Sequence, residues 1–231
     1  MLKRLIVHIL KKFNIGIYRL HKVKVNSQIG PLERNSLDYK ERQITFSGVK
    51  DYLDLSRLDF YNKILDFCIE NGVNFNNSDI VDVGCSGGWL LEMIGKNYSP
   101  ISITGYDWSK KTIEFAKKLS PLPSYVQFDI LKNEIKKKFD IVICTEVLEH
   151  LLYPEKAINN LLLMTRKGGF ICISVPDGRK DTSYEHINFW SPESFRLFIE
   201  KSVTIADSKY GILNDSYNPN CSYNIVILKK K

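Results

Sequence analysis

The feature that most constrains the fold is a regular alternation of short apolar runs and helical segments from residue 79 onward. Runs such as DIVDVG, ISITGYD and FDIVICT are followed by segments whose apolar residues recur every three or four positions. The runs predict strands and the wider spacing predicts amphipathic helices. Such alternation is typical of an α/β fold, in which helices cover both faces of a doubly wound, mostly parallel sheet.

Seven apolar runs are expected to form the sheet. They are residues 79–84, 101–107, 124–130, 139–145, 168–176, 202–208 and 222–229. The last two lie close enough in sequence to form an antiparallel hairpin at the sheet edge. A further helical pattern before the sheet, ended by Asn71-Gly72, predicts a cap helix over 51–72.

The first 50 residues form a separate region, an arm and linker, ahead of the domain expected over 51–231 and its core over 79–231. Seven of the 33 basic residues and none of the 26 acidic ones fall within 1–32, so the net charge of +7 belongs to the arm. Within residues 1–24, apolar residues spaced by three and four from Leu2 to Phe13 predict a basic amphipathic helix that Asn14 and Gly16 end, too short and too charged to span a bilayer. Such a helix either lies on an anionic membrane surface or packs on the body, and both alternatives stay open.

The five cysteines predict neither a disulfide framework nor a metal site. Their number is odd, no C-x-x-C pair occurs, and three lie inside apolar runs. Buried, reduced thiols are typical of a cytoplasmic protein. We therefore expect a cytoplasmic location, with contact at the inner membrane surface if the arm binds lipid.

The segment VDVGCSGGWLL, residues 81–91, indicates a ligand-binding loop. It follows the first expected strand, whose carboxyl end borders the ligand crevice of such a sheet. The dinucleotide pattern G-x-G-x-x-G fails, because Ser86 and Trp89 replace two of its glycines. The pattern that fits is acid-x-Gly-x-small-x-Gly, formed by Asp82, Gly84, Ser86 and Gly88. A side chain at Gly84 or Gly88 is expected to hold the ligand away from the backbone.

Four segments in order resemble the class I S-adenosylmethionine-dependent methyltransferases of the small-molecule type. They are VDVGCSGGWLL, GYDWS, FDI at 128–130, and the stretch from Phe139 to Pro176. The resemblance implies a Rossmann-like fold and S-adenosyl-L-methionine as cofactor. The residues that it places at the cofactor are Asp82, Gly84, Cys85, Ser86, Gly88, Asp107, Trp108, Asp129 and Ile130.

Asp107 and Asp129 carry the most specific expectations. Asp107 ends the second expected strand, where a carboxylate accepts both ribose hydroxyls through charge-assisted hydrogen bonds. Asp129 follows the third expected strand, where the family's acid meets the adenine amino group. The alternative for each is a turn-forming residue at a strand end.

Two histidines are candidates for acid–base catalysis. His150 follows the fourth expected strand in EVLEHL, and His186 precedes an expected helix in EHINFWSPESF. The resemblance places both near the acceptor, and histidine titrates near neutral pH. The alternative for each is a structural role in fixing its loop.

We expect methylation of an oxygen or nitrogen of a small molecule, a sugar or lipid-linked saccharide. A quinone or other lipid-ring acceptor is a close alternative. RNA methylation and a non-catalytic binding protein are further alternatives. The neutral body and the lack of an Asn-Pro-Pro-Tyr-type segment argue against nucleic acid.

Overall fold

The computed structural model describes residues 40–41, 43–203 and 206–231. The arm over 1–24, with the amphipathic helix expected from Leu2 to Phe13, lies outside the described residues. The unit Lys40–Lys231 has its own dense set of internal contacts. Within the described residues, no helix is both long and apolar enough to cross a membrane.

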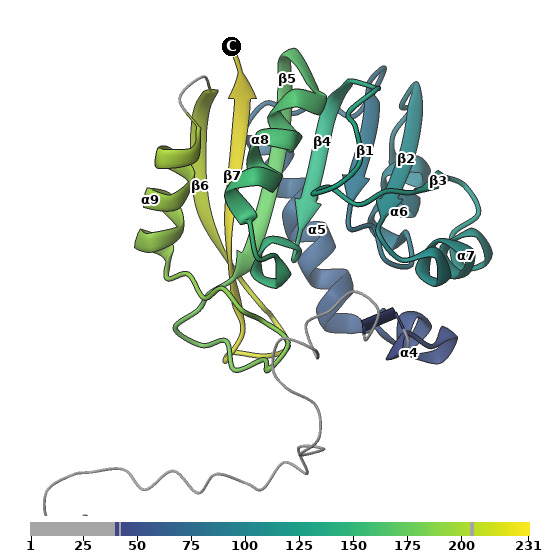
Figure 1. Ribbon diagram of the computed structural model, residues 1–231, viewed down its shortest axis with the longest axis horizontal. Helices are drawn as coiled ribbons and strands as arrows, with labels where there is room; N and C mark the ends of the chain where they lie inside the picture. Colours follow the sequence, from purple (N-terminus) through teal and green to yellow (C-terminus); the bar gives the residue numbers. More distant parts are fainter. Residues whose placement is uncertain (1–39, 42, 204–205) are drawn as a thin grey trace, which may run out of the picture. The chain divides into compact units, whose positions relative to one another are not determined.

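A seven-stranded sheet forms the centre of this unit, in the order β3-β2-β1-β4-β5-β7-β6 (Figure 1). The strands are β1 (Asp79–Val83), β2 (Ser102–Asp107), β3 (Ser124–Gln127), β4 (Phe139–Thr145), β5 (Thr165–Pro176), β6 (Ala206–Asn214) and β7 (Ser222–Lys230). β1 to β5 pair in parallel, and β7 pairs antiparallel with both β5 and β6. This confirms the Rossmann-like, mostly parallel sheet with an antiparallel hairpin at its edge.

Helices cover both faces of the sheet (Figure 1). They are α4 (Phe46–Asp51), α5 (Leu55–Glu70), α6 (Trp89–Asn97), α7 (Lys110–Leu119), α8 (Pro154–Met164) and α9 (Pro192–Ser202), with a short 3-10 helix η1 (Leu148–His150). α5, α6 and α7 share one hydrophobic core, and α8 and α9 share the other. Alternate residues of a strand enter opposite cores, as Ile80 and Val81 of β1 do.

The strand order fixes where a ligand can bind. β1 pairs with β2 on one side and with β4 on the other. The strands therefore follow one another outward from β1 in one direction as far as β3, and β4 then begins the other half of the sheet on the opposite side of β1. In open sheets of this type the ligand crevice lies at the carboxyl ends of the strands where the two halves meet. The loops after β1, β2 and β4 meet there.

Three boundaries differ from the sequence expectations. Residues 46–51, assigned to the linker, form α4, where Phe46 packs edge-on against Phe115 of α7. The cap helix starts at Leu55 and not at residue 51, because Asp54 caps it by accepting the N–H of Arg57. β3 ends at Gln127, before the turn at Asp129.

The sixth strand is also displaced from its expected position. The run 202–208 was expected to be a strand, but Ser202 ends α9 and the strand continues from Ala206 to Asn214. Segment 209–214 gave no clear strand signal because its only fully buried apolar residue is Leu213 and it contains Gly211. Pairing with β7 along its whole length therefore defines β6.

Candidate functional site

The glycine loop takes backbone conformations that explain its sequence. Gly84, Ser86 and Gly88 all have positive φ, at 85°, 48° and 78°. A Cβ on Gly84 would strike the Val147 side chain, and one on Gly88 would strike the Tyr125 hydroxyl. The glycines are thus required by packing within the protein, and the expectation that a side chain there would hold the ligand away stays a prediction. Ser86 occupies a left-handed conformation that glycine adopts without strain.

Asp107 joins this loop to the end of β2. Its carboxylate accepts the backbone N–H of Ser86 at 3.2 Å and that of Ser109 at 2.9 Å. Burial raises the pKa of Asp107 to about 6, although both hydrogen bonds favour the charged form. The side chain is therefore positioned by the backbone on both sides, at the strand end where the ribose acid was expected.

Asp82 is a buried carboxyl group without a full set of partners. Its Oδ1 is buried and accepts no hydrogen bond from the described part of the chain. Burial, and secondarily the charge of Asp107, raise the pKa of Asp82 to about 7. An unpaired buried oxygen is costly unless a ligand completes it. Asp82 therefore fits a role toward a cationic ligand group.

A cavity of about 190 Å³ opens beside Asp82 and the glycine loop. Its lining residues are Tyr52, Arg57, Tyr61, Asp82, Gly84, Cys85, Ser86, Thr145 and Glu146. They come from the end of α4, from α5, from the β1 loop and from the end of β4. The cavity thus combines three of the expected loop residues, one expected acid and two charged residues that the sequence analysis did not single out.

Arg57 and Glu146 are those two charged residues. The Arg57 guanidinium lies 4.2 Å from the ring centroid of Tyr52, and no carboxylate of the described residues is within ion-pair distance of it. Glu146 has a φ of 57° and accepts the Ser174 hydroxyl at 3.1 Å. Burial raises the pKa of Glu146 to about 7, against the charge of Arg57. One feature of the sequence could have pointed to Arg57. It is a basic residue on the apolar face of the α5 helix, four residues before Tyr61.

The remaining residues expected at the cofactor differ in how they are used. The N–H groups of Gly84 and Cys85 both donate to the Tyr106 carbonyl, and the Cys85 thiol packs in the core. Asp129 accepts the N–H of Leu131 at 2.9 Å and pairs with Lys132, so it has the turn-forming role. Contact of Asp129 with adenine stays a prediction.

Ile130 and Trp108 stay predictions as well. The Ile130 side chain is buried in the α8 core and its carbonyl accepts the Asn160 amide, so only other parts of the residue could face a ligand. Trp108 is partly buried, and its carbonyl accepts the Gln127 side chain.

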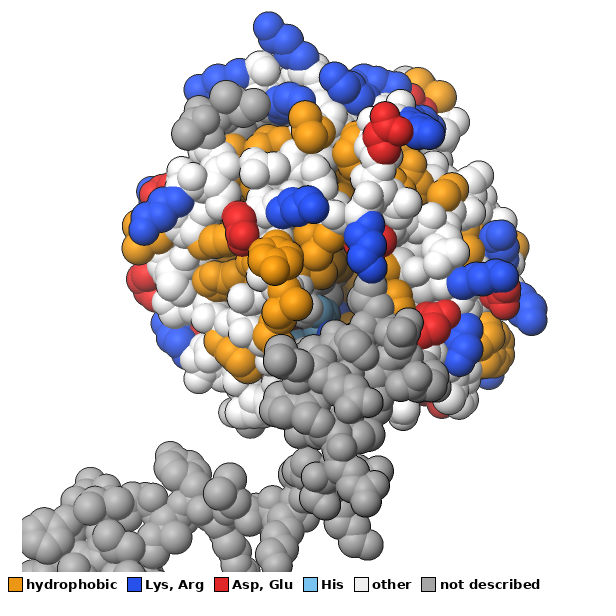
Figure 2. All heavy atoms as spheres, in the orientation of Figure 1, with side chains coloured by type: hydrophobic (Ala, Val, Ile, Leu, Met, Phe, Trp, Pro, Cys, Tyr) orange, Lys and Arg blue, Asp and Glu red, His pale blue; other side chains and the backbone are white. Residues whose placement is uncertain are grey.

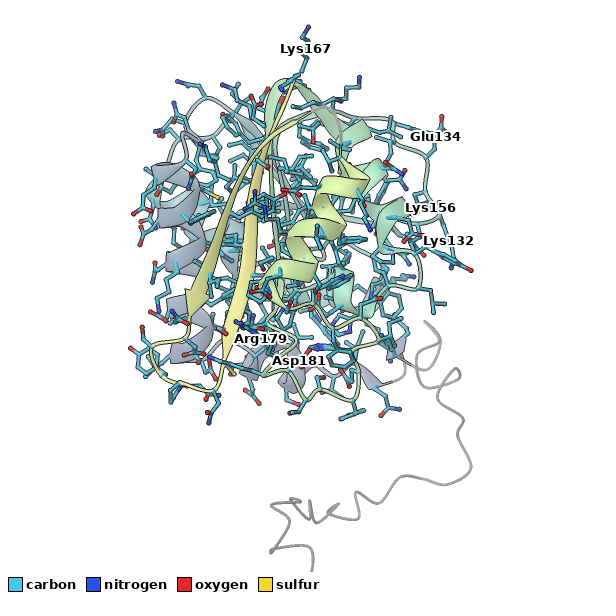
Figure 3. The ribbon with its side chains drawn as sticks, turned by 90° about the vertical axis from the view of Figure 1, so that its left-hand side faces the viewer. Lys132, Glu134, Lys156, Lys167, Arg179 and Asp181 are labelled. Carbon is cyan, nitrogen blue, oxygen red and sulfur yellow. The ribbon has the colours of Figure 1, made fainter. Side chains whose placement is uncertain are left out.

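The structure brings His150 and His186 together, although 35 residues separate them in sequence. Their ring centroids lie 4.7 Å apart, in an edge-on arrangement. His150 ends η1 after β4, and His186 lies on the loop after β5, which also carries Arg179 and Asp181 (Figure 3). Burial, followed by the charges of Lys40 and His186, lowers the pKa of His150 to about 4. Acid–base roles for the two histidines stay predictions.

Hydrophobic side chains border this part of the surface. Figure 2 shows histidine at the foot of a group of hydrophobic side chains, and the described residues contain only His150 and His186. Exposed hydrophobic residues from the neighbouring loops are Leu152, Tyr153 and Phe189. Loop and strand ends thus place a polar cavity and a histidine pair at the carboxyl edge of a doubly wound α/β sheet, where proteins of this class bind their ligands.

Comparison with known proteins identifies the family. The sequence matches the family described as a methyltransferase domain over residues 55–206. The chain therefore belongs to this methyltransferase family, and its resemblance to the class I S-adenosylmethionine-dependent methyltransferases is confirmed.

Individual relatives are distant. A ubiquinone biosynthesis O-methyltransferase from Vibrio parahaemolyticus is 25% identical over an alignment of 203 residues, and the match covers 72% of this chain and 83% of the relative. A protein of the same name from Coxiella burnetii is 31% identical over an alignment of 112 residues, and that match covers 46% of this chain and 47% of the relative.

Solved structures share the fold. The N-methyltransferase NodS from Bradyrhizobium japonicum, in complex with S-adenosyl-L-homocysteine, superposes with a TM-score of 0.59 at 18% identity, covering 77% of this chain and 88% of that one. Magnesium protoporphyrin IX methyltransferase from Synechocystis gives a TM-score of 0.61 at 15% identity, covering 86% and 96%. At these identities the likeness concerns the fold.

Proposed function

We propose that the protein transfers a methyl group from S-adenosyl-L-methionine to a hydroxyl oxygen on the ring of a quinone-type small molecule. The observation that carries the proposal is the cavity in which the glycine loop and Asp82 face Arg57 and Glu146. This cavity suits the cofactor's amino-acid end.

The residues fit this cofactor at three points. Asp107 has the position for the ribose diol, because a carboxylate can accept both hydroxyl groups. Asp82, with an unpaired buried oxygen, suits the ammonium group of the amino-acid end. Arg57 lines the same cavity and suits its carboxylate, since a guanidinium binds a carboxylate through two parallel hydrogen bonds.

The chain's own contribution to the reaction is orientation and exclusion of water. When bound, S-adenosyl-L-methionine would supply an activated methyl group, which the acceptor oxygen would attack in line with S-adenosyl-L-homocysteine as the leaving group. Asp107 and the loop would hold the ribose of the cofactor, while Asp82 and Arg57 would hold its amino-acid end, and such positioning accounts for a large share of catalysis in bimolecular transfer. His150 and His186 lie at the crevice as candidates for contact with the acceptor hydroxyl.

The acceptor is inferred from two supports. The named relatives are ubiquinone biosynthesis O-methyltransferases, which favours the quinone alternative and lends the sugar or lipid-linked saccharide expectation no support. Exposed Leu152, Tyr153 and Phe189 near the histidine pair suit an apolar ring or tail. A lipid-soluble acceptor also agrees with the proposed membrane contact of residues 1–24 and with a cytoplasmic protein working at the inner membrane surface.

Calorimetry tests the cofactor half of the proposal. Wild-type protein is expected to bind S-adenosyl-L-homocysteine at micromolar concentration. Asp107→Ala should bind about 10- to 150-fold more weakly, because it removes a charged acceptor worth about 1.5–3 kcal/mol. Lys167→Ala, exposed near the amino end of β5 and so at the opposite edge of the sheet from the crevice (Figure 3), is the control and should match the wild type. Absence of binding by the wild type would overturn the assignment.

A transfer assay tests the acceptor half. Radiolabelled methyl groups should appear on hydroxylated phenol and quinol rings, and not on nucleotide sugars or RNA. Labelling of RNA that falls steeply with salt would instead favour the RNA alternative. Cofactor binding without transfer to any of the three classes would favour a non-catalytic protein.

A further inference from the structure

Within the described residues, the position of Arg57 depends on helix α5 and on aromatic rings rather than on an ion pair. Its guanidinium lies 4.2 Å from the ring centroid of Tyr52 and 5.0 Å from that of Phe60. Stacking on aromatic faces holds a guanidinium without using its N–H donors. The direction in which these donors point is therefore set by how firmly the first turns of α5 are held.

The first turns of α5 are bound to the turn between β6 and β7, residues 215–221. Asp59 accepts the backbone N–H of Ser216 at 3.0 Å and the Ser216 hydroxyl at 3.1 Å. Lys63 lies one helical turn further along α5, and its Nζ donates to Asp59 at 2.5 Å, to the Ser216 hydroxyl at 2.6 Å and to the Asn214 carbonyl at 2.5 Å. Asp59 and Ser216 are 157 positions apart in the sequence, so the end of the chain holds a helix that precedes the sheet.

Asp215 makes a second link between the same two segments. It accepts the hydroxyl of Ser56, the residue directly before Arg57. Its other carboxylate oxygen accepts the backbone N–H groups of Tyr217 and Asn218. Asp215 thus orders the turn and also ties it to the first turn of α5. We name these linked side chains the turn clamp, which consists of Ser56, Asp59, Lys63, Asp215 and Ser216.

The two carboxylates of the turn clamp are charged at neutral pH. Burial alone would raise the pKa of Asp59, but hydrogen bonds from Lys63 and Ser216 hold this pKa below its ordinary value. The pKa of Asp215 is likewise below its ordinary value, because hydrogen bonds from Ser56 and two backbone N–H groups outweigh burial. Hydrogen bonds to a charged acceptor are about twice as strong as neutral ones, so replacing either aspartate by asparagine weakens the clamp and keeps the side-chain size.

Strand β7 supports Arg57 through a further contact. The ring of Tyr223 lies 4.2 Å, between centroids, from the ring of Phe60, on which Arg57 packs. Burial raises the pKa of Tyr223, and the charge of Arg57 opposes this shift, as expected for groups that share one environment. The hairpin of β6 and β7 therefore contacts both the helix that carries Arg57 and a ring that supports its guanidinium.

We propose that Asp59 and Asp215 are positioning residues, which through the turn clamp hold Arg57 in the orientation that binds the carboxylate of the cofactor's amino-acid end. A guanidinium binds a carboxylate through two parallel hydrogen bonds, and this geometry tolerates little displacement. The clamp should therefore favour ligands that carry the amino-acid end, whereas the adenosine end depends on Asp107. This inference rests on the proposed contact between Arg57 and the cofactor.

Two ligands separate positioning from a general structural role. S-adenosyl-L-homocysteine carries the amino-acid end, and 5'-methylthioadenosine has the same adenosine and sulfur without it. In calorimetry, Asp59→Asn and Asp215→Asn should bind S-adenosyl-L-homocysteine about three- to tenfold more weakly, a coupling typical of one hydrogen-bond network. Both variants should bind 5'-methylthioadenosine as the wild type does, which also shows that they are folded. Asp66→Asn, the same substitution at an exposed position of α5, is the matched control and should bind both ligands normally.

A double-mutant cycle with Arg57 provides the second test. Arg57→Gln should bind S-adenosyl-L-homocysteine about 10- to 150-fold more weakly, because it removes a charged donor. Adding Asp59→Asn to Arg57→Gln should weaken binding no further, because the clamp acts through Arg57.

Three outcomes would contradict the clamp alone, given a wild type that binds S-adenosyl-L-homocysteine. They are equal weakening of both ligands, no weakening of either, and an effect of Asp59→Asn that persists in the Arg57→Gln protein. A wild type that binds neither ligand would instead overturn the cofactor assignment, and the clamp with it.

Discussion

Asp82 shows how one residue can couple ligand binding to protonation. Its pKa of about 7 lies above the usual aspartate value of 3.8, because burial disfavours the charged form. Between these two values the unfolded chain is ionised while the folded protein still holds the proton. Its contribution to stability is therefore full below about pH 4 and is lost as the pH rises to about 7.

The pH dependence of unfolding is the first prediction at this scale. From pH 4 to pH 7, the unfolding free energy of the wild type should fall relative to that of Asp82→Asn, by up to about 4 kcal/mol. Asparagine carries no charge, so the difference isolates Asp82 from Asp107 and Glu146. Urea titrations at several pH values measure it. A difference that stays constant with pH contradicts the assignment.

The same proton gives a binding prediction. An ammonium group beside Asp82 favours the charged carboxylate, so binding of S-adenosyl-L-homocysteine at pH 6.5 should release protons. Calorimetry in buffers of different ionisation enthalpy measures the number released. Asp82→Asn should release fewer protons than the wild type, and equal release would exclude Asp82 as the source.

Ser86 is the residue at which the loop departs from glycine. Its φ of 48° is a left-handed conformation that costs a side-chain-bearing residue about 1–2 kcal/mol. Ser86→Gly should therefore raise the free energy of unfolding by up to about 1 kcal/mol, after the entropy that glycine adds to the unfolded chain. Chemical denaturation tests this, with Ser86→Ala as the matched control that keeps the strain. If both variants behave alike, backbone strain does not explain the position.

Sequence alone could locate the acids and glycines of the candidate site, but not which side chains from distant segments lie next to one another there. Asp82, Gly84 and Asp107 follow from strand ends and loop spacing, which are local. The meeting of His150 with His186 depends on hydrogen bonds between η1 and the loop after β5, which no local pattern encodes. Arg57 was missed because a basic residue on an apolar helix face indicates no function until the cavity that it lines is known.

At the scale of elements, the N-terminus of α5 controls where Arg57 lies. The Asp54 side chain accepts the Arg57 N–H at 2.8 Å and so fixes the first turn of the helix. Asp54→Ala should lower the free energy of unfolding by about 1 kcal/mol, whereas Asp54→Ser, which can still cap, should lower it by less. Thermal or urea unfolding distinguishes the two. An alanine variant as stable as the serine variant would show that the cap contributes little.

Strands in the middle of the sheet were predicted better than elements at its margins. β1 and β4 are buried on both faces, so they carry consecutive apolar residues, at 80–81 and 141–144, in place of a strict apolar-polar alternation. β6 lies at the edge, where side chains are mostly exposed and pairing with β7 decides the structure. α4 has no buried residue, which is why composition alone assigned it to a linker.

At the scale of the whole molecule, charge separates the arm from the body. Residues 1–32 carry the entire net charge of +7. Full-length protein is therefore expected to float with anionic liposomes at low salt and to be released at high salt. Replacement of Lys3, Lys11 and Lys12 by glutamine should reduce flotation more than the same replacement at Lys136, Lys137 and Lys138, which are exposed on the body. An equal loss of flotation in both variants would indicate that basic side chains anywhere on the protein are attracted to the anionic membrane, and not those of the arm in particular.

The position of β7 between β5 and β6 has a consequence for the order of assembly. β7 leaves the ribosome after every other described element, yet it pairs with strands on both of its sides. Until it emerges, β5 presents an unpaired edge and both hydrophobic cores lack residues that β7 supplies. The crevice can therefore be shaped early in synthesis, but the sheet closes only when translation of this last strand is complete.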